Sequence, residues 1–308
     1  MQTNEQSKSF RSHRPVGLAA LALTASWLLL GIGCLGTPKA TAATALLVNQ
    51  FPTPESANSI RDRLQRIFGF QVILVSDDSS VPAIARQAAL IVITANVASF
   101  KMTQYRNVAA PILIWEWAAY DGLALSLDNG EFSSYTETQI EIVNPAHPLA
   151  AGFPAGPLTV FDAPASEVAF VDPALLAPSV TVIATAADGT GRAAIFGVEA
   201  GAELHPDPTS GAPIIAPARR TGFFLGGQSF LELNDDGLKL FDAAVNWTAK
   251  PHFHRPTFDV GKVTLSWVGT GTLEQTESLS PLAWTVAPSQ ANPQTVPATG
   301  TRFYRIRQ

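Results

Sequence analysis

Residues 45–75 read ALLVNQFPTPESANSIRDRLQRIFGFQVILV, and this stretch indicates the fold. It contains two short, mainly apolar runs, residues 45–49 and 71–75, which are typical of strands that are covered on both faces. The segment between them carries apolar residues at helical spacing: Ile60, Leu64, Ile67 and Phe68. A strand, a helix and a second strand of this kind predict a right-handed crossover within a parallel sheet.

The same alternation continues along the chain. Residues 89–94 and 111–117 are expected to form two further strands, and residues 221–225 the last parallel strand. A helix over residues 235–247 closes the pattern. The sequence therefore predicts an α/β domain over residues 45–249, with a flavodoxin-like parallel sheet and helices on both faces.

Additional strands are expected in the middle of the chain and at its end. The middle holds five strand candidates: residues 139–143, 158–161, 167–171, 180–184 and 192–197. Residues 250–261 are rich in proline and have the composition of a linker. Residues 262–308 alternate like strands between glycines and prolines, which predicts a small all-β module. Because so small a module is near the lower limit for independent folding, we expect it to pack against the main domain or a neighbour.

Residues 1–42 have the order of a signal peptide. Residues 1–15 are polar and basic, residues 16–35 carry no charge, and Ala-Thr-Ala at residues 40–42 has the pattern of a cleavage site, with cleavage after Ala45 as an alternative. Cleavage there predicts a secreted, periplasmic or cell-surface protein. Two alternatives stay open: an uncleaved anchor, since a membrane span takes about 20 apolar residues, and lipidation at Cys34.

The composition excludes several kinds of site. Cys34 is the only cysteine, so a processed chain has no disulfide, thiolate ligand or cysteine nucleophile. The net charge is −5 without a basic run, which predicts no nucleic-acid partner and membrane contact only through the N-terminal segment, if it is retained or lipidated. The pairs His205/Asp207 and His252/His254 lack an obvious third ligand, so we expect no metal. No cofactor is indicated.

Two segments of the chain resemble ThuA-like proteins, a branch of the class I glutamine amidotransferase-like, flavodoxin-like superfamily. Residues 144–153, NPAHPLAAGF, resemble the family's His-Pro…Gly-Leu segment. Residues 219–227, RRTGFFLGG, resemble its Gly-Arg-hydrophobic-Leu-Gly-His strand, and a closing helix that ends in Asn246-Trp247 also matches. The similarity covers residues 45–249 and implies a sugar-utilisation context.

The chain departs from that superfamily at the positions that carry its chemistry. Amidotransferases of the superfamily place a cysteine on a tight turn after a central strand, whereas the matching turn here, residues 115–119, has neither Cys nor Ser. Gly227-Gln228 stands where ThuA-like proteins carry histidine after Leu-Gly. No positioned nucleophile–base pair is left to form a covalent intermediate.

Candidate site residues follow the predicted strand ends, because sites in open parallel sheets lie outside the carboxyl ends of the strands. The residues expected to bind a ligand there are Asn49, Ser76, Thr94, Asn96, Glu116, Trp117 and Gln228. The neighbouring tryptophan rings are expected to desolvate Glu116 and raise its pKa, which suits a general acid or a sugar ligand. Equally, Glu116 is expected to cap the next helix or pair with Arg106. His147 is either a pocket ligand or general base, or a turn histidine bonded to backbone.

The sequence leaves three functional hypotheses open. The leading hypothesis is a non-catalytic exported protein that binds a ligand, such as a carbohydrate, or an envelope protein at the strand ends. The alternative is a secreted hydrolase or sugar-modifying enzyme that uses Glu116 and His147 as catalytic residues; a structural envelope protein is the third. The enzyme hypothesis requires Glu116, His147 and Asn96 to converge on one cavity.

Export predicts a measurable processing event. Protein recovered from the producing cell is expected to have lost about the first 42 residues, because the basic, apolar and Ala-Thr-Ala segments follow the order that signal peptidase requires. Intact-mass analysis checks this prediction. A full-length mass would favour the anchor instead, and a lipid adduct on Cys34 would favour the lipoprotein.

Overall fold

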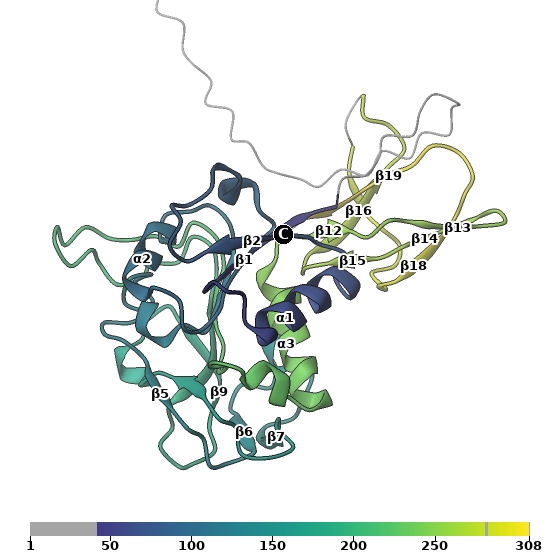
Figure 1. The fold of residues 1–308 in the computed structure, drawn as a ribbon. Helices are drawn as coiled ribbons and strands as arrows, with labels where there is room; N and C mark the ends of the chain where they lie inside the picture. The colour runs from purple at the N-terminus through teal and green to yellow at the C-terminus, as the bar shows by residue number, and fades with distance from the viewer. Residues whose placement is uncertain (1–41, 281–282, 308) are drawn as a thin grey trace, which may run out of the picture.

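A computed structural model describes residues 42–280 and 283–307 of the chain (Figure 1). Within these residues, the central sheet has nine strands in the order β2-β1-β3-β4-β11-β10-β9-β6-β7. Their bounds are β1 Thr44–Asn49, β2 Gln71–Ser76, β3 Leu90–Ile93, β4 Ile112–Ile114, β6 Gln139–Ile142, β7 Gly156–Thr159, β9 Thr181–Ala186, β10 Ala193–Val198 and β11 Arg220–Gly222.

Half of this sheet is the predicted parallel sheet. β2, β1, β3, β4 and β11 pair in parallel, and their spatial order is that of a flavodoxin-like fold. Strand interiors are buried on both faces, since Leu47 packs into one apolar cluster while Leu46 and Val48 pack into the other. The predicted α/β class and the five parallel strands are therefore confirmed.

The other half of the sheet is antiparallel, which the sequence pattern did not predict. β10 pairs antiparallel with β11, and β9, β6 and β7 continue the sheet in alternating directions. One of the five strand candidates, β8 (Val168–Phe170), instead pairs with β5 (Glu131–Ser133) outside the central sheet. Local patterning finds these strands because each has apolar residues, but it carries no signal for their partners.

Helical segments cover both faces of the sheet unequally. On one face lie the amphipathic helices α1 (Glu55–Arg66) and α3 (Asp235–Thr248), which a bidentate ion pair between Arg63 and Asp242 joins. On the other face, the helical segments among the described residues are short: α2 (Ser99–Met102) and the 3-10 helices η1 (Ala83–Gln87), η2 (Thr103–Tyr105) and η3 (Trp117–Ala119). Three further 3-10 helices are η4 (Pro148–Ala150), η5 (Pro173–Leu175) and η6 (Ser229–Glu232).

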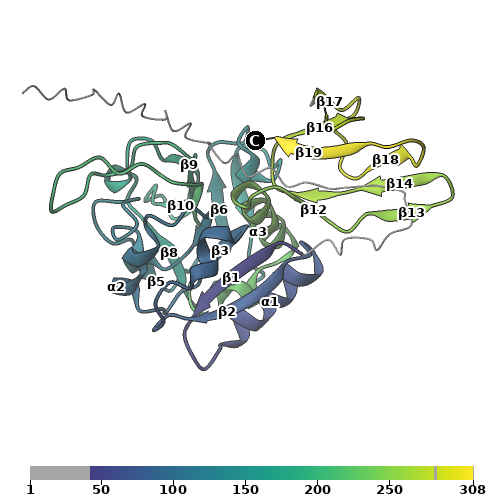
Figure 2. The same cartoon turned by 90° about the horizontal axis from the view of Figure 1, so that it is seen from above.

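The C-terminal module consists of small antiparallel sheets (Figure 2). Its strands are β12 His252–Phe253, β13 Thr257–Asp259, β14 Lys262–Leu265, β15 Trp267–Val268, β16 Thr272–Thr276, β17 Thr285–Val286, β18 Gln294–Pro297 and β19 Phe303–Arg307. Trp267 and Tyr304 lie in its apolar core. β12 and β13 fall within residues 250–261 and pair with β15 and β14, so the segment with linker composition belongs largely to the module.

The module packs against the amino-terminal edge of the parallel strands. Arg219, just before β11, donates from Nη1 to Thr270 Oγ1 of the module over 2.6 Å, and its guanidinium lies 4.8 Å from the ring of Trp247. The ring of His252 lies 4.7 Å from that of Phe70, and its Nε2 is 3.3 Å from the carbonyl oxygen of Phe68. Ion-dipole and aromatic contacts therefore connect the two parts.

The predicted signal peptide falls almost entirely on residues 1–41. These residues, which include Cys34, lie outside the described part of the chain. In the described part of the chain, no helix has the length and apolar character needed to span a bilayer.

Arg220 is a buried cation that backbone carbonyls surround. Its side chain is 1% exposed at the start of β11. Its two terminal nitrogens donate to five carbonyl oxygens, those of Arg106, Val108, Ala110, Ala218 and Arg219. Burial lowers the pKa of the guanidinium to about 10, so it stays charged near neutral pH. The side chain thus ties the loop before β4 to β11.

We expect Arg220→Lys to lower the free energy of unfolding by about 2–4 kcal/mol, because an ammonium group has three donors and leaves buried carbonyls unpaired. Urea denaturation measures the change. The matched control is Arg66→Lys, at an exposed position, which is expected to change stability by less than about 0.5 kcal/mol. Equal effects of the two substitutions would show that the carbonyl contacts of Arg220 contribute nothing specific.

Candidate functional site

The predicted ligand residues of β1 to β4 meet at one edge of the sheet. Asn49 and Ser76 are register partners at the ends of β1 and β2. Thr94 follows β3, and its hydroxyl donates to the carbonyl of Val48 over 3.2 Å. Glu116 follows β4 by two residues. The parallel direction of these strands is what brings the residues together.

Glu116 is buried and bonded to backbone at this edge. Its side chain caps η3, with Oε1 accepting from the N–H of Ala118 over 3.2 Å, while Oε2 accepts from the N–H of Val97 over 3.3 Å. The residue is 4% exposed, and desolvation raises the pKa of its carboxyl from 4.5 to about 6 despite these bonds. Of the two structural roles left open by the sequence, capping is the one observed, since Arg106 pairs with Asp207 instead.

Other predicted rim residues are also bonded within the protein. Asn49 is fully buried, with Nδ2 donating to the carbonyl of Gln50 over 2.6 Å. The hydroxyl of Ser76 accepts from the N–H of Asp78 over 3.3 Å. Asn96 is exposed and has a φ of 62°, a left-handed conformation that asparagine tolerates. Trp117 packs, half-buried, against the apolar cluster on the α2 side of the sheet.

Gln228 lies at the same edge, at the start of α1. Its Oε1 accepts from the N–H of Ser56 over 3.1 Å, and the hydroxyl of Ser56 donates to the carbonyl of Gly227 over 3.2 Å. Pro54 at the N-cap makes no side-chain cap of its own. A helix N-terminus in this position is a ready site for anions, but here an amide from the loop after β11 occupies part of it.

His147 lies at the opposite edge. β9 runs in the same direction as β11, and β6 runs against β9, so the carboxyl end of β6 points to the amino-terminal edge of the parallel strands. His147 follows β6, and its ring lies 5.1 Å from that of Trp247 at an interplanar angle of 58°; Arg219 also contacts Trp247. Its Nδ1 accepts from the N–H of Leu149, and burial lowers the pKa of the imidazole. The structure therefore does not bring His147 to Glu116.

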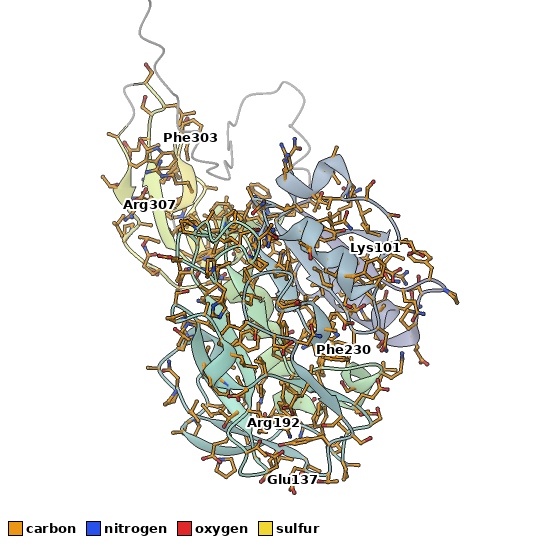
Figure 3. The ribbon with its side chains drawn as sticks, turned by 90° about the vertical axis from the view of Figure 1, so that its left-hand side faces the viewer. Lys101, Glu137, Arg192, Phe230, Phe303 and Arg307 are labelled. Atoms are coloured by element: carbon orange, nitrogen blue, oxygen red, sulfur yellow. The ribbon has the colours of Figure 1, made fainter. Side chains whose placement is uncertain are left out.

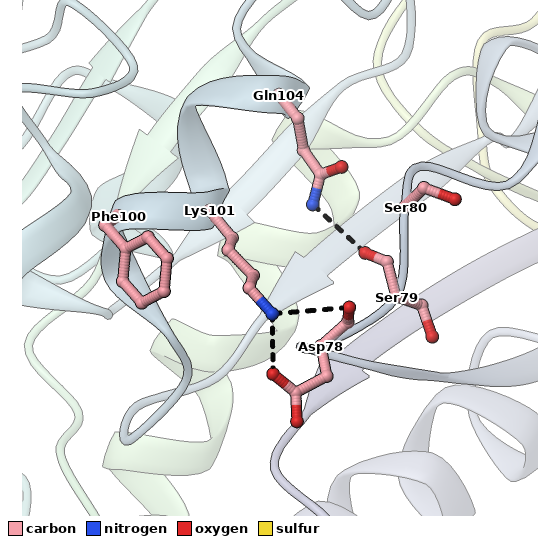
Figure 4. Close-up of a pocket in the computed structure, with 6 residues that line it drawn as sticks. All are labelled: Asp78, Ser79, Ser80, Phe100, Lys101 and Gln104. Carbon is pink, nitrogen blue, oxygen red and sulfur yellow. Dashed lines mark hydrogen bonds and ion pairs between the residues drawn. The ribbon is translucent and has the colours of Figure 1, made fainter.

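A shallow depression of about 410 Å³ lies on the carboxyl edge between the loop after β2 and the helical turns after β3 (Figure 4). Six residues line it: Asp78, Ser79, Ser80, Phe100, Lys101 and Gln104. Lys101 Nζ lies 2.7 Å from Asp78 Oδ1, and Gln104 Nε2 donates to the carbonyl of Ser79 over 3.2 Å. Figure 3 shows Lys101 well away from Phe303 and Arg307 of the module.

Phe100 is the unusual member of this group, since it is 78% exposed beside five residues that can exchange hydrogen bonds. Sequence reasoning missed the depression because its residues come from two loops that only the β2-β1-β3 strand order brings near one another. The sequence feature that could have indicated the depression is Phe100 next to the charged Lys101, in the segment that follows β3.

No site for a metal ion is evident in the described ranges 42–280 and 283–307, where no three His, Cys, Asp or Glu side chains are grouped as ligands. His205 Nε2 lies 2.9 Å from the carbonyl of Leu175, and Asp207 accepts from the N–H groups of Thr209 and Ser210. These contacts explain both residues by local structure.

Comparisons with known proteins add little. No family model and no curated protein matches the sequence. Among solved structures, a glutamine amidotransferase from Thermotoga maritima matches with a TM-score of 0.38 and 12% identity, over 66% of this chain and 82% of that chain. So weak a likeness carries no argument about activity, and the fold assignment stands on the strand order itself.

The raised pKa of Glu116 makes a prediction about stability. The carboxyl of Glu116 is harder to ionise in the folded state than in the unfolded state. Its contribution to the free energy of unfolding is therefore fully present below the ordinary pKa of 4.5 and is lost as pH rises through about 6. Relative to Glu116→Gln, which does not titrate, the wild type is expected to lose about 2 kcal/mol between about pH 4 and pH 7.5. Urea unfolding of both proteins across this range measures the difference. The assignment would be contradicted if the stability of the wild type relative to Glu116→Gln stayed constant, or rose, as pH increased toward neutral.

Proposed function

We propose that the chain is an exported binding protein that holds a carbohydrate in the depression between the loop after β2 and α2. The observation that carries the proposal is the exposed ring of Phe100 beside the hydroxyls of Ser79 and Ser80 and the Lys101–Asp78 pair. An aromatic surface with a few convergent polar groups is the usual composition of a small-ligand site.

A sugar ring matches this arrangement in chemistry. Its C–H face is apolar and stacks on an aromatic ring, while its hydroxyls both donate and accept hydrogen bonds. The carboxylate of Asp78 is an acceptor, the ammonium of Lys101 is a donor, and the serine hydroxyls are both. The depression is shallow, so we expect weak binding of a free sugar and tighter binding of a chain that extends along the edge.

The burial of Glu116 and its distance from His147 favour a binding function over a catalytic one. Both carboxyl oxygens of Glu116 accept backbone N–H groups, and its side chain is almost inaccessible. His147 lies at the other edge of the sheet. A pKa of about 6 for Glu116 does suit a general acid, and this is the observation that supports the alternative of a hydrolase or sugar-modifying enzyme.

A relation to ThuA-like proteins is part of the same proposal. The segment RRTGFFLGG forms β11 and the loop that reaches α1, and NPAHPLAAGF surrounds η4. The relation is supported by the resemblance of these two sequence segments alone. Export is supported by the order of residues 1–42 alone.

Titration of neutral oligosaccharides into the protein, followed by calorimetry or by amide NMR shifts, tests the binding function. We expect Phe100→Ala to weaken binding about tenfold, the equivalent of about 1.4 kcal/mol. The matched control is Ile67→Ala, which removes a large, 52% exposed apolar side chain from the end of α1 and is expected to leave affinity unchanged.

Two results would count against this function. Equal affinity in wild type and Phe100→Ala would remove the depression as the site. Turnover of a sugar or ester substrate that Glu116→Gln abolishes, in a variant that remains folded, would replace the binding protein by the enzyme.

A further inference from the structure

The hairpin of β13 and β14 carries two exposed apolar side chains at the end of the module that points away from the main domain (Figures 1 and 2). Phe258 is 66% exposed and Val260 is 94% exposed. Asp259 Oδ1 accepts from the N–H of Val260, and Gly261 has a φ of 69°, so the turn between the strands holds a defined form. A convex tip of this kind differs from the concave surface around Phe100.

The position of Phe258 in the sheet explains its exposure. Phe258 is the register partner of Val263, and directly paired residues of antiparallel strands point to the same face. Val263 is buried in the core of the module, whereas Phe258 is not part of that core. The apolar face of the β13-β14-β18 sheet therefore continues beyond the part that the β17-β16-β19 sheet covers.

The module as a whole is positive, although the tip itself also contains Asp259. Lys262 adjoins the tip and Arg255 lies two residues before β13; both are exposed and make no ion pair within the described residues. Residues 250–308 carry six basic and three acidic residues, a net charge of +3, whereas residues 42–249 carry ten basic and 21 acidic residues, a net charge of −11. An anionic surface would attract the module and repel the main domain.

The start of β1 lies beside the module. The carbonyl of Ala43 accepts from Gln71, that of Thr44 accepts from Ala89, and that of Ala89 accepts from Lys250, where the chain enters the module. β1 thus begins beside the module, at the amino-terminal edge. Residues 36–43 separate the uncharged run 16–35 from β1 by at most roughly 28 Å.

From these observations we propose that the β13–β14 tip inserts into the interfacial region of an anionic lipid bilayer. Phe258 and Val260 enter the boundary between headgroups and acyl chains, and Arg255 and Lys262 lie against the lipid phosphates. Two such side chains bind weakly alone, and in a chain that retains its N-terminal run as an anchor, that run in the same bilayer raises their effective concentration. The Phe100 edge then faces away from the membrane. This surface is independent of the carbohydrate site.

The experiment uses the full chain with Cys34→Ser and Val260→Cys, labelled at residue 260 with an environment-sensitive fluorophore. Vesicles of equimolar phosphatidylcholine and phosphatidylglycerol are expected to shift the emission to the blue, increase its intensity, and expose it to a lipid-phase quencher. Adding Lys262→Gln is expected to weaken this response about fivefold, the contribution of one basic residue near an anionic surface. The 94% exposure of Val260 makes the substitution compatible with folding.

Two control positions make the outcome decisive. A label at Phe100→Cys in the same Cys34→Ser background is expected to show no change, because the carboxyl edge faces water. A label on Cys34 in the otherwise unchanged chain reports whether the N-terminal run is in the bilayer. A response at Cys34 without one at residue 260 overturns the proposal. A response at residue 260 that depends on protein concentration and not on vesicles also overturns it, because a second copy of the chain would then cover the tip.

Discussion

The carbonyl cage around Arg220 is the interaction on which the arrangement of this molecule depends. β11 is the seam of the sheet, parallel to β4 on one side and antiparallel to β10 on the other. A buried guanidinium costs much free energy unless acceptors surround it, and here the acceptors come from the loop before β4 and from the start of β11. Arg219, its neighbour, reaches Glu199, Trp247 and the module. Two adjacent cations therefore join both halves of the sheet and the module at one strand.

The reversal of direction at β11 also separates the two edges of the sheet by role. Loops after the parallel strands gather Glu116, Gln228 and the Phe100 depression at the carboxyl edge. The loop after β6 carries His147 to the amino edge, where it contacts Trp247 near the module. A parallel β6 would have placed His147 at the carboxyl edge with Glu116, but still four strands away from β4. Strand direction and strand order together therefore keep His147 and Glu116 apart.

Glu116 illustrates how one buried group combines opposing effects. Desolvation disfavours its charge, while the backbone N–H groups of Ala118, Val97 and Asn96 favour it, and desolvation is the larger effect. The carboxylate joins the turn after β3 to η3 across the edge of the sheet. The buried carboxylate of Glu116 lowers the stability of the fold near neutral pH. It can still join these two segments, because the same two hydrogen bonds satisfy N–H donors that would otherwise be buried and unpaired.

The sequence by itself determined the α/β class, the five parallel strands, α1 and α3, and the β character of residues 262–308, because period and burial are local properties of a chain. It also identified Glu116 as desolvated, since Trp115 and Trp117 are its neighbours in sequence. Only the tertiary structure decided that β6, β7, β9 and β10 extend the main sheet, that residues 252–259 belong to the module, and that Gln228 caps α1. Those features join residues far apart in the chain, and the free energy that selects such partners comes from packing and hydrogen bonds between segments, which no local pattern records.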